Sequence, residues 1–195
     1  QRVVDTACSF GLPLTKAELL RRLAVGFEEV SLKQAVRAMS VFPTGGRLGP
    51  EQMIYVARVE NPAGRVIYRR ERAAMPRKEV IDPATAWQVH SMMAGSLYRG
   101  SSKGALDELV EKPFHGAGKG GSTHDFGDCW FLGYNKRITC GVWTGFLSSN
   151  GEPIYPGAFS KDLAMPVWQA AMNAAAPVFG GGSLAPPGNI VEIPV

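Results

Sequence analysis

The sequence predicts an α+β fold in which helices flank an antiparallel β-sheet. The predicted elements come in the order helices, a hairpin, a helix, three strands and a final helix. An antiparallel sheet that packs helices against its faces accommodates this order. The chain has 195 residues, of which 45% are hydrophobic, and this is enough for one domain with a sizeable core.

The first half of the sequence predicts short helices followed by a β-hairpin. Ser31 is a suitable N-cap because its hydroxyl can accept a free amide of the first helical turn, and Thr15 can act in the same way. The turn between the two strands lies at residues 61–64, where Asn, Pro and Gly are close together. The resulting elements are helices at residues 1–10, 15–24 and 32–42 and strands at residues 52–60 and 64–70.

The second half predicts a long helix, three strands and a last helix. Asp82 and Pro83 favour a helix start, since the carboxylate accepts free amide hydrogens and proline fits the first helical position. The last two strands mix aromatic and β-branched side chains, as half-buried strands do. The elements are a helix at residues 83–98, a short helical or irregular segment at 105–110, strands at 112–118, 126–134 and 138–146, and a helix at 163–175.

The end of the sequence differs in composition from the rest. Residues 177–195 contain four prolines and several glycines, which is typical of an extended, mobile tail. We find no internal repeat that would divide the preceding residues further. We therefore expect a folded part at residues 1–176 and a Pro/Gly-rich tail at residues 177–195.

Charge and hydrophobicity narrow the classes of partner. The formal net charge is +4 and the isoelectric point about 9.1, but the basic residues are scattered along the chain. A nucleic-acid surface is therefore not favoured, whereas mild basicity suits work beside anionic cell-envelope polymers. No stretch approaches the roughly 20 apolar residues needed to span a bilayer, and no signal peptide precedes the first helix. Membrane association would therefore depend on an anchor outside this sequence.

The three cysteines, Cys8, Cys129 and Cys140, do not indicate a disulfide framework or a structural zinc site. Their number is odd and they lack C-x-x-C spacing. Cys129 and Cys140 fall in two strands that we expect to pair, so a cross-strand contact is conceivable. Buried free thiols are the favoured interpretation.

The most informative segment is the run K-G-G-S-T at residues 119–123, which lies between two predicted strands. Residues 116–121 match the letters of the dinucleotide fingerprint G-x-G-x-x-G, but that fingerprint requires a following helix. A phosphate-binding P-loop requires a hydroxyl residue directly after the lysine, where this chain has Gly120. Both nucleotide interpretations are therefore weak. On spacing alone, a glycine-rich turn with an exposed lysine is the simplest interpretation.

The other polar candidates near this run favour structural roles. His115 and His124 flank it without a partner at metal-ligand spacing, so we predict no metal site. We expect His90 to be packed or half-exposed in its helix. Asp125 and Asp128 could form a carboxylate pair for acid–base chemistry, but turn capping by Asp125 and an ion pair of Asp128 are favoured. The aromatic residues that indicate core positions are Trp130, Phe131, Trp143 and Trp168. One of these aromatic side chains could instead line a substrate groove.

Residues 119–123 and 128–134 (D-C-W-F-L-G-Y) resemble the third active-site motif of the penicillin-binding transpeptidases, which usually reads K-T-G-T-T and then D-x-W-F-x-G-Y. The resemblance continues in order from about residue 10 to residue 175 and is strongest for the bifunctional glycosyltransferase–transpeptidase branch. The other matching segments are residues 26–32, 35–42, 50–68, 82–86, 100–106, 139–145 and 164–172. The resemblance implies the C-terminal part of a D,D-peptidase/β-lactamase-like transpeptidase fold.

The resemblance also implies roles for the residues of the run. Lys119 would attract the terminal carboxylate of a substrate or of a β-lactam. The Ser122 hydroxyl would bind the same carboxylate, and its backbone N–H would be one of two oxyanion donors. Gly121 would let the substrate backbone lie close to the strand, and Thr123 would be structural. Gly120 stands where the family has threonine, which we expect to loosen the strand.

Two family motifs are missing from this sequence. No serine lies three residues before a lysine, because Ser31 precedes Lys33 and Ser101 precedes Lys103 by only two residues. The only match to the S-x-N motif lies at residues 148–150, far too late in the chain. The resemblance therefore implies a part of a peptidoglycan D,D-transpeptidase whose nucleophilic serine lies on an absent upstream segment.

The resemblance further implies partners and a location. The partners would be the peptidoglycan stem peptide, β-lactams and the upstream part of the same protein, without a metal or cofactor. The location would be the bacterial cell envelope, at the extracytoplasmic face of the inner membrane. A non-catalytic module that binds peptidoglycan or another protein on the same fold is the alternative. A β-lactamase or carboxypeptidase, which shares the fold, is a weaker one.

Overall fold

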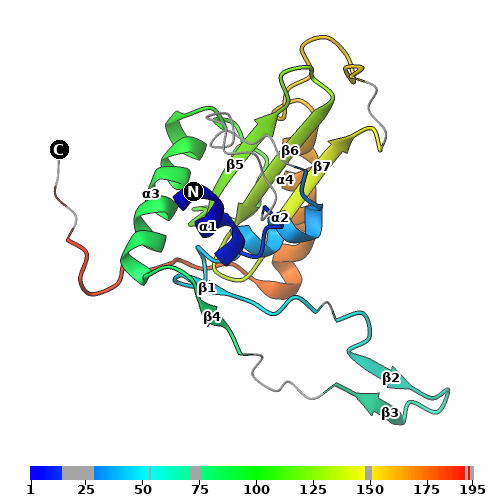
Figure 1. Ribbon diagram of the computed structural model, residues 1–195. Coiled ribbons are helices and arrows are strands. Elements are labelled where there is room, and N and C mark those ends of the chain that lie inside the picture. The colour runs from blue at the N-terminus through cyan, green and yellow to red at the C-terminus, as the bar shows by residue number, and fades with distance from the viewer. Residues whose placement is uncertain (15–28, 53, 71–75, 148–150, 192, 194–195) are drawn as a thin grey trace.

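The computed structural model describes residues 1–14, 29–52, 54–70, 76–147, 151–191 and 193. Its centre is a three-stranded antiparallel sheet of order β5-β6-β7, built from β5 (Ala117–Ser122), β6 (Asp128–Tyr134) and β7 (Thr139–Gly145). Helix α4 (Ala164–Phe179) covers one face of this sheet and α2 (Leu32–Met39) lies on the other, while α3 (Pro83–Arg99) runs beside β5 (Figure 1). The predicted α+β class with an antiparallel sheet flanked by helices is confirmed.

Two further ribbons lie outside this sheet. Strands β2 (Arg58–Glu60) and β3 (Val66–Arg69) form an antiparallel hairpin that projects from the body (Figure 1). Strands β1 (Arg47–Leu48) and β4 (Lys78–Glu79) pair at its base. The sequence analysis missed β1 and β4, because two residues are too few to show a period. It also predicted a strand at residues 52–60, of which only β2 is a strand in the described part.

The helix starts follow the predicted capping chemistry. The Ser31 hydroxyl accepts the Gln34 amide, and the Gln34 side chain accepts the Ser31 amide, which completes a capping box. Asp82 accepts the Thr85 amide at 2.9 Å, directly before a proline in the first turn of α3. Helix α1 (Arg2–Ser9) matches the prediction for residues 1–10. The helix predicted at residues 15–24 lies outside the described residues.

Other predicted boundaries differ from the structure. Helix α4 continues past the predicted end at residue 175 to Phe179 and includes Pro177 in its last turn. Strand β5 begins at Ala117 rather than at residue 112. Residues 180–191 form neither helix nor strand, but Leu184 packs against the body and the Gly182 amide donates to Glu111. This part of the tail therefore contacts the folded part.

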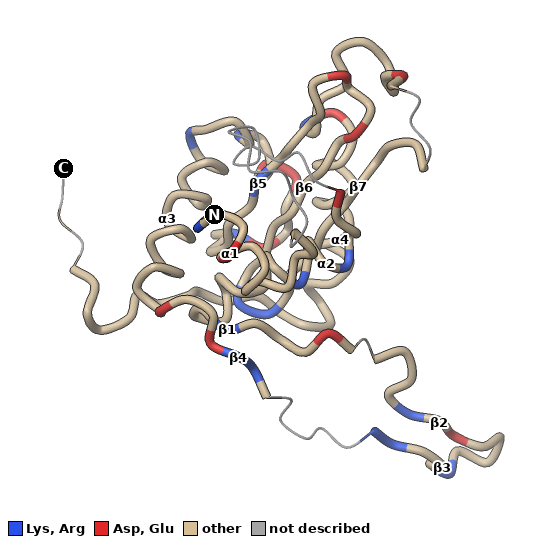
Figure 2. The backbone as a smooth tube through the Cα atoms, in the orientation of Figure 1, with Lys and Arg blue, Asp and Glu red and all other residues tan. Residues whose placement is uncertain are grey.

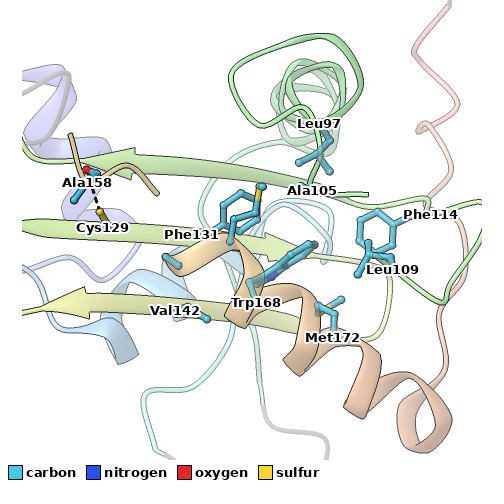
Figure 3. Packing of buried hydrophobic residues seen from close by; sticks show 12 residues of the cluster. Leu97, Ala105, Leu109, Phe114, Cys129, Phe131, Val142, Ala158, Trp168 and Met172 are labelled. Atoms are coloured by element: carbon cyan, nitrogen blue, oxygen red, sulfur yellow. Dashed lines mark hydrogen bonds between the residues drawn. The ribbon is translucent and has the colours of Figure 1, made fainter. Parts of the chain in front are cut away.

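The main core forms where α4 lies on the sheet, and its centre is Trp168. Figure 3 shows this indole between the sheet and the neighbouring helix and loop residues. Its ring lies 4.8 Å from the ring of Phe131 and 6.0 Å from that of Phe114, centroid to centroid. A Cβ atom at Gly133 would come within 2.5 Å of the indole, so the strand must carry a glycine there.

A buried polar pair joins α3 to the sheet. His90 Nδ1 and the Tyr134 hydroxyl are 3.1 Å apart, and both residues are buried. Burial lowers the pKa of His90 and raises the pKa of Tyr134, because each charged form would lose its hydration. The prediction of a packed histidine is therefore confirmed.

The basic residues are scattered over the molecule, as the sequence indicated. Basic and acidic residues are interspersed along the body, and the β2–β3 hairpin also carries both signs (Figure 2). Within the described ranges, no helix is both long enough and apolar enough to cross a membrane.

We predict that Trp168→Ala lowers the free energy of unfolding by about 3–5 kcal/mol, because it empties the centre of the core. Denaturant unfolding followed by circular dichroism measures this loss. Val167→Ala is the matched control, since Val167 is the preceding residue of α4 and is 52% exposed; it should change the free energy by about 0.5 kcal/mol or less. A loss below about 1 kcal/mol for Trp168→Ala would contradict this account of the core.

We also predict that the free energy of unfolding falls as the pH drops below 6.5, the ordinary pKa of the His90 side chain. The folded state depresses this pKa, so the unfolded state takes up the proton first and acid favours unfolding. The free energy of unfolding should change with pH by at most about 1.4 kcal/mol per pH unit. This change should appear at pH values above the range in which carboxylates titrate. Denaturant unfolding at a series of pH values measures it. His90→Gln, which keeps a polar partner for Tyr134, should remove this part of the slope, and equal slopes in both proteins would refute the assignment.

Candidate functional site

The run at residues 119–123 lies on an edge strand. Within the described residues, β5 pairs only with β6, with Lys119 opposite Leu132 and Ser122 opposite Cys129. The Gly120 amide points away from β6 and donates to the buried Ser102 hydroxyl at 3.4 Å. The edge of β5 is therefore held at one point by the turn that follows α3.

The direction of the remaining amides follows from strand geometry. In an antiparallel pair, consecutive backbone N–H groups point alternately toward the partner and away from it. The Thr123 amide donates to the Asp128 carbonyl on the β6 side, whereas the Gly120 amide points to the outer side. The Ser122 amide shares the direction of Gly120 and thus points to the outer edge. A bound carbonyl oxygen would have to lie at this edge, so the predicted oxyanion role of Ser122 stays a geometrically consistent prediction.

The side chains of the run divide between the two faces of the sheet. Gly120 and Ser122 lie on the α4 face, whereas Lys119, Gly121 and Thr123 lie on the α2 face. The Lys119 side chain is exposed, and its ammonium donates to the Gly120 carbonyl. The structure thus brings the predicted site residues onto one strand edge, with the lysine and the serine on opposite faces.

The hydroxyl groups at the end of β5 have different surroundings. Thr123 Oγ1 accepts the Asp128 amide at 2.9 Å across the hairpin turn, a structural contact of the kind predicted for it. Ser122 Oγ accepts the Ser160 amide at 2.9 Å, from the loop before α4. The Cys129 thiol lies 3.9 Å from the same oxygen. Because the Cys129 thiol donates to the Ala158 carbonyl, its sulfur is the acceptor nearest to the Ser122 hydroxyl hydrogen, and sulfur is a weak acceptor.

Gly120 is tightly packed rather than loose. A Cβ atom at this position would lie 2.7 Å from Ser160 Oγ and 3.2 Å from Ser160 Cβ. The Ser160 side chain is buried and donates to the Trp130 carbonyl of β6. Ser160 thus fills the space that a side chain at residue 120 would take, and the loosening of the strand expected from glycine stays a prediction. Sequence reasoning missed Ser160, since it lies far along the chain from the run and matches no motif.

The cysteines are free and do not face each other. Cys129 pairs with Thr144 and Cys140 pairs with Gly133 in the sheet, so the conceivable contact between the two thiols is absent. Burial raises the pKa of both thiols, which keeps them protonated and unreactive as nucleophiles. The preference for free thiols is confirmed.

The remaining polar candidates have structural surroundings. His115 and His124 are exposed, and the described residues contain no cluster that could hold a metal ion. Asp125 accepts the Gly127 amide at 3.2 Å, which confirms turn capping. The ion pair expected for Asp128 is wrong, because its carboxylate accepts the indole N–H of Trp143 instead. Trp143 is the fifth residue of β7 and Asp128 is the first residue of β6, and no local sequence pattern relates the two positions.

The tryptophans split into two kinds. Trp168 is fully buried, as the core prediction required. Trp130 and Trp143 are only half-buried, and their rings lie 6.3 Å apart on the face that also carries Lys119. These two side chains are therefore available to line the approach to β5.

A groove lies away from the run. It has a volume of about 720 Å³ and lies between α2, the start of β7 and the end of α4. Its lining is almost entirely apolar, and it borders the edge of the sheet opposite to β5. The candidate site is the outer side of β5 beyond Gly120, where no strand pairs with it in the described residues.

Comparison with known proteins gives relatives of one kind. No family model matches the chain. Penicillin-binding protein 2D of Bacillus subtilis is 27% identical over 180 residues, which cover 89% of this chain and 24% of that protein. Penicillin-binding protein 1A of Pseudomonas aeruginosa is 32% identical over 118 residues, which cover 60% of this chain and 14% of that protein. The chain thus spans about a quarter or less of these curated relatives.

Solved structures of the same kind share the fold. The crystal structure of penicillin-binding protein 1A from Haemophilus influenzae superimposes with a TM-score of 0.80 at 19% identity, covering 96% of this chain and 32% of that one. The structure of the penicillin-binding protein PonA1 from Mycobacterium tuberculosis gives a TM-score of 0.70 at 20% identity, covering 100% of this chain and 58% of that one. The chain is thus similar in sequence to penicillin-binding proteins and shares the fold of their solved structures.

Proposed function

We propose that the chain is part of a D,D-transpeptidase domain that cross-links peptidoglycan stem peptides through an acyl-serine intermediate. The observation that supports the proposal is that the run at residues 119–123, which resembles the family's third motif, lies on a strand whose outer side pairs with no other strand in the described residues. The nucleophilic serine, its lysine partner and the S-x-N motif would lie on a segment outside this sequence.

The open edge of β5 suits an extended peptide. Such a peptide can add to a sheet edge through backbone hydrogen bonds, with specificity from neighbouring side chains. Ser102 occupies the edge at Gly120, so a substrate would pair beyond that point, at the outward-facing amide of Ser122. The exposed Lys119 ammonium would attract the terminal carboxylate of the stem peptide.

The proposed reaction consists of two acyl transfers. The absent serine attacks the carbonyl of the penultimate residue of the stem peptide, and the terminal D-alanine leaves. An amine of a second stem peptide then takes the acyl group and releases the serine. The Ser122 N–H would stabilise the oxyanion in both steps, and one such donor typically contributes about 2.7–4 kcal/mol. β-Lactams would acylate the same serine.

The proposed setting follows from the same resemblance. The protein would act in the bacterial cell envelope, at the extracytoplasmic face of the inner membrane, and its partners would be stem peptides and β-lactams. A non-catalytic binding module on the same fold is the second candidate. The observation that favours it is the absence of an S-x-x-K and a usable S-x-N motif from this sequence.

We predict that benzylpenicillin binds this chain without covalent attachment and shifts the amide resonances of residues 119–123. Nuclear magnetic resonance titration of the ¹⁵N-labelled chain measures the dissociation constant. Lys119→Ala should weaken binding by about fivefold to tenfold, because a charge-assisted contact to the carboxylate is lost. Lys136→Ala is the control, since this exposed lysine lies in the turn at the other end of the strands. Equal effects of the two substitutions would contradict a carboxylate site at Lys119.

Intact-mass analysis of every polypeptide in a native preparation tests the catalytic part of the proposal. After incubation with benzylpenicillin, the expected result is an adduct on a polypeptide that carries S-x-x-K, with none on this chain. An adduct on the chain itself would place the nucleophile within these 195 residues and overturn the proposal. Folded protein without any adduct would favour the binding module.

A further inference from the structure

We propose that Ser160, in the loop before α4, is a positioning residue for the candidate site. It fills the space beside Gly120, and its backbone N–H holds the Ser122 hydroxyl in one orientation. The hydroxyl hydrogen of Ser122 then stays free to donate to a bound carboxylate. This last step rests on the proposed function, whereas the contacts of Ser160 do not.

The packing at Gly120 is the first support. An added Cβ there would collide with both side-chain atoms of Ser160, at 2.7 and 3.2 Å. By contrast, an added Cβ at Gly121 meets nothing within 4 Å. Neither glycine has a positive φ angle, so backbone strain does not separate the two positions. The requirement for glycine at residue 120 therefore comes from Ser160.

The position of Ser160 is itself fixed by several contacts. The residue is 6% exposed, and its hydroxyl donates to the Trp130 carbonyl in the strand next to β5. Its carbonyl accepts the Met165 amide at 2.8 Å, which ties the loop to the start of α4. Nearby, the Ala158 carbonyl accepts the Cys129 thiol at 3.5 Å, as Figure 3 shows. These hydrogen bonds hold the loop in place against β6 and the start of α4.

The contact to Ser122 transmits this support to the site. The Ser160 amide donates to Ser122 Oγ at 2.9 Å, so the oxygen acts as acceptor for the loop. A hydroxyl has one hydrogen, and in the described residues the acceptor nearest to the hydrogen of Ser122 is the Cys129 sulfur at 3.9 Å, which is a weak acceptor. A carboxylate at the strand edge would supply a stronger one. The loop would thus determine how the hydroxyl is presented.

A double-mutant cycle on this chain tests the packing. Gly120→Ala should lower the melting midpoint by about 2–10 °C, as expected for overpacking. Ser160→Gly should restore most of this loss in the double variant, and Ser160→Ala, which removes Oγ but keeps Cβ at 3.2 Å, should restore less. Gly121→Ala is the matched control, and its effect should be small and independent of the residue at position 160. Additive effects of Gly120→Ala and Ser160→Gly would overturn the proposal.

Hydrogen exchange of the Ser160 amide tests the positioning contact. Ser122→Ala should raise its exchange rate by about tenfold, because the acceptor oxygen is lost. Ser122→Thr, which keeps the hydroxyl, should preserve the protection. A general loss of stability would raise exchange across the sheet, so the amide of Phe131 serves as an internal reference. Unchanged exchange at Ser160 in Ser122→Ala would overturn the proposal.

A third measurement separates this proposal from the proposed function. In wild-type chain, benzylpenicillin should shift the amides of both Ser122 and Ser160, since the two share a hydrogen bond. In Ser122→Ala, the shift at Ser160 should disappear while that near Lys119 persists. If the cycle shows coupling but benzylpenicillin shifts neither region, the proposed function fails and the packing role of Ser160 stands. If benzylpenicillin shifts Lys119 but leaves Ser160 unaffected in wild type, the positioning role fails and the proposed function stands.

Discussion

The close packing of α4 against the backbone of β6 at Gly133 is the constraint on which the rest of the structure depends. Trp168 can lie this close to the sheet only because Gly133 lacks a side chain at the point of contact. This close approach fixes the distance between α4 and β6, and it brings Phe131 and Phe114 against the indole. Burial of so large an aromatic surface is a major source of core stability. The loop that enters α4 is thereby set over β5.

The candidate site is a consequence of this arrangement. Met165 at the start of α4 holds the Ser160 carbonyl, and Ser160 in turn contacts Ser122 and Trp130. On the outer side of β5, Ser102 accepts the Gly120 amide. The strand edge is therefore held from both sides, by the loop before α4 and by the turn after α3. A glycine-rich strand has little stiffness of its own, so these outside contacts supply the rigidity that a binding edge needs.

The parts of the fold that the sequence predicted are those with local signals. The caps at Ser31 and Asp82 and the hairpin turn after β2 depend on neighbouring residues, and the structure has them where expected. The class of fold was predictable because the resemblance preserves order over nearly the whole chain. The strand that carries the run was placed too early, at residues 112–118 instead of Ala117–Ser122. Helix α4 was predicted too short, since it continues through Pro177 to Phe179; Val178 and Phe179 are exposed, so burial of the last turn does not explain this extension.

The contacts that sequence reasoning missed are long-range. The indole of Trp143 replaces the expected ion partner of Asp128, and this depends on which residues face each other across β6 and β7. The contact between Ser160 and Gly120 likewise joins segments that no local pattern relates. The sequence showed that Gly120 departs from the family motif. It did not show that Ser160 packs against this glycine, because Ser160 lies in a loop far along the chain.

The glycines of the sheet show why single positions are poor guides to function here. Glycine weakens a strand when nothing takes the place of its side chain. In this sheet, Trp168 covers Gly133, Val36 and Leu32 cover Gly141, and Ser160 covers Gly120. Each glycine is thus one half of a contact whose other half comes from a helix or a loop. A residue that looks degenerate in the motif can therefore belong to a well-packed site, and its effect must be judged together with the side chain that covers it.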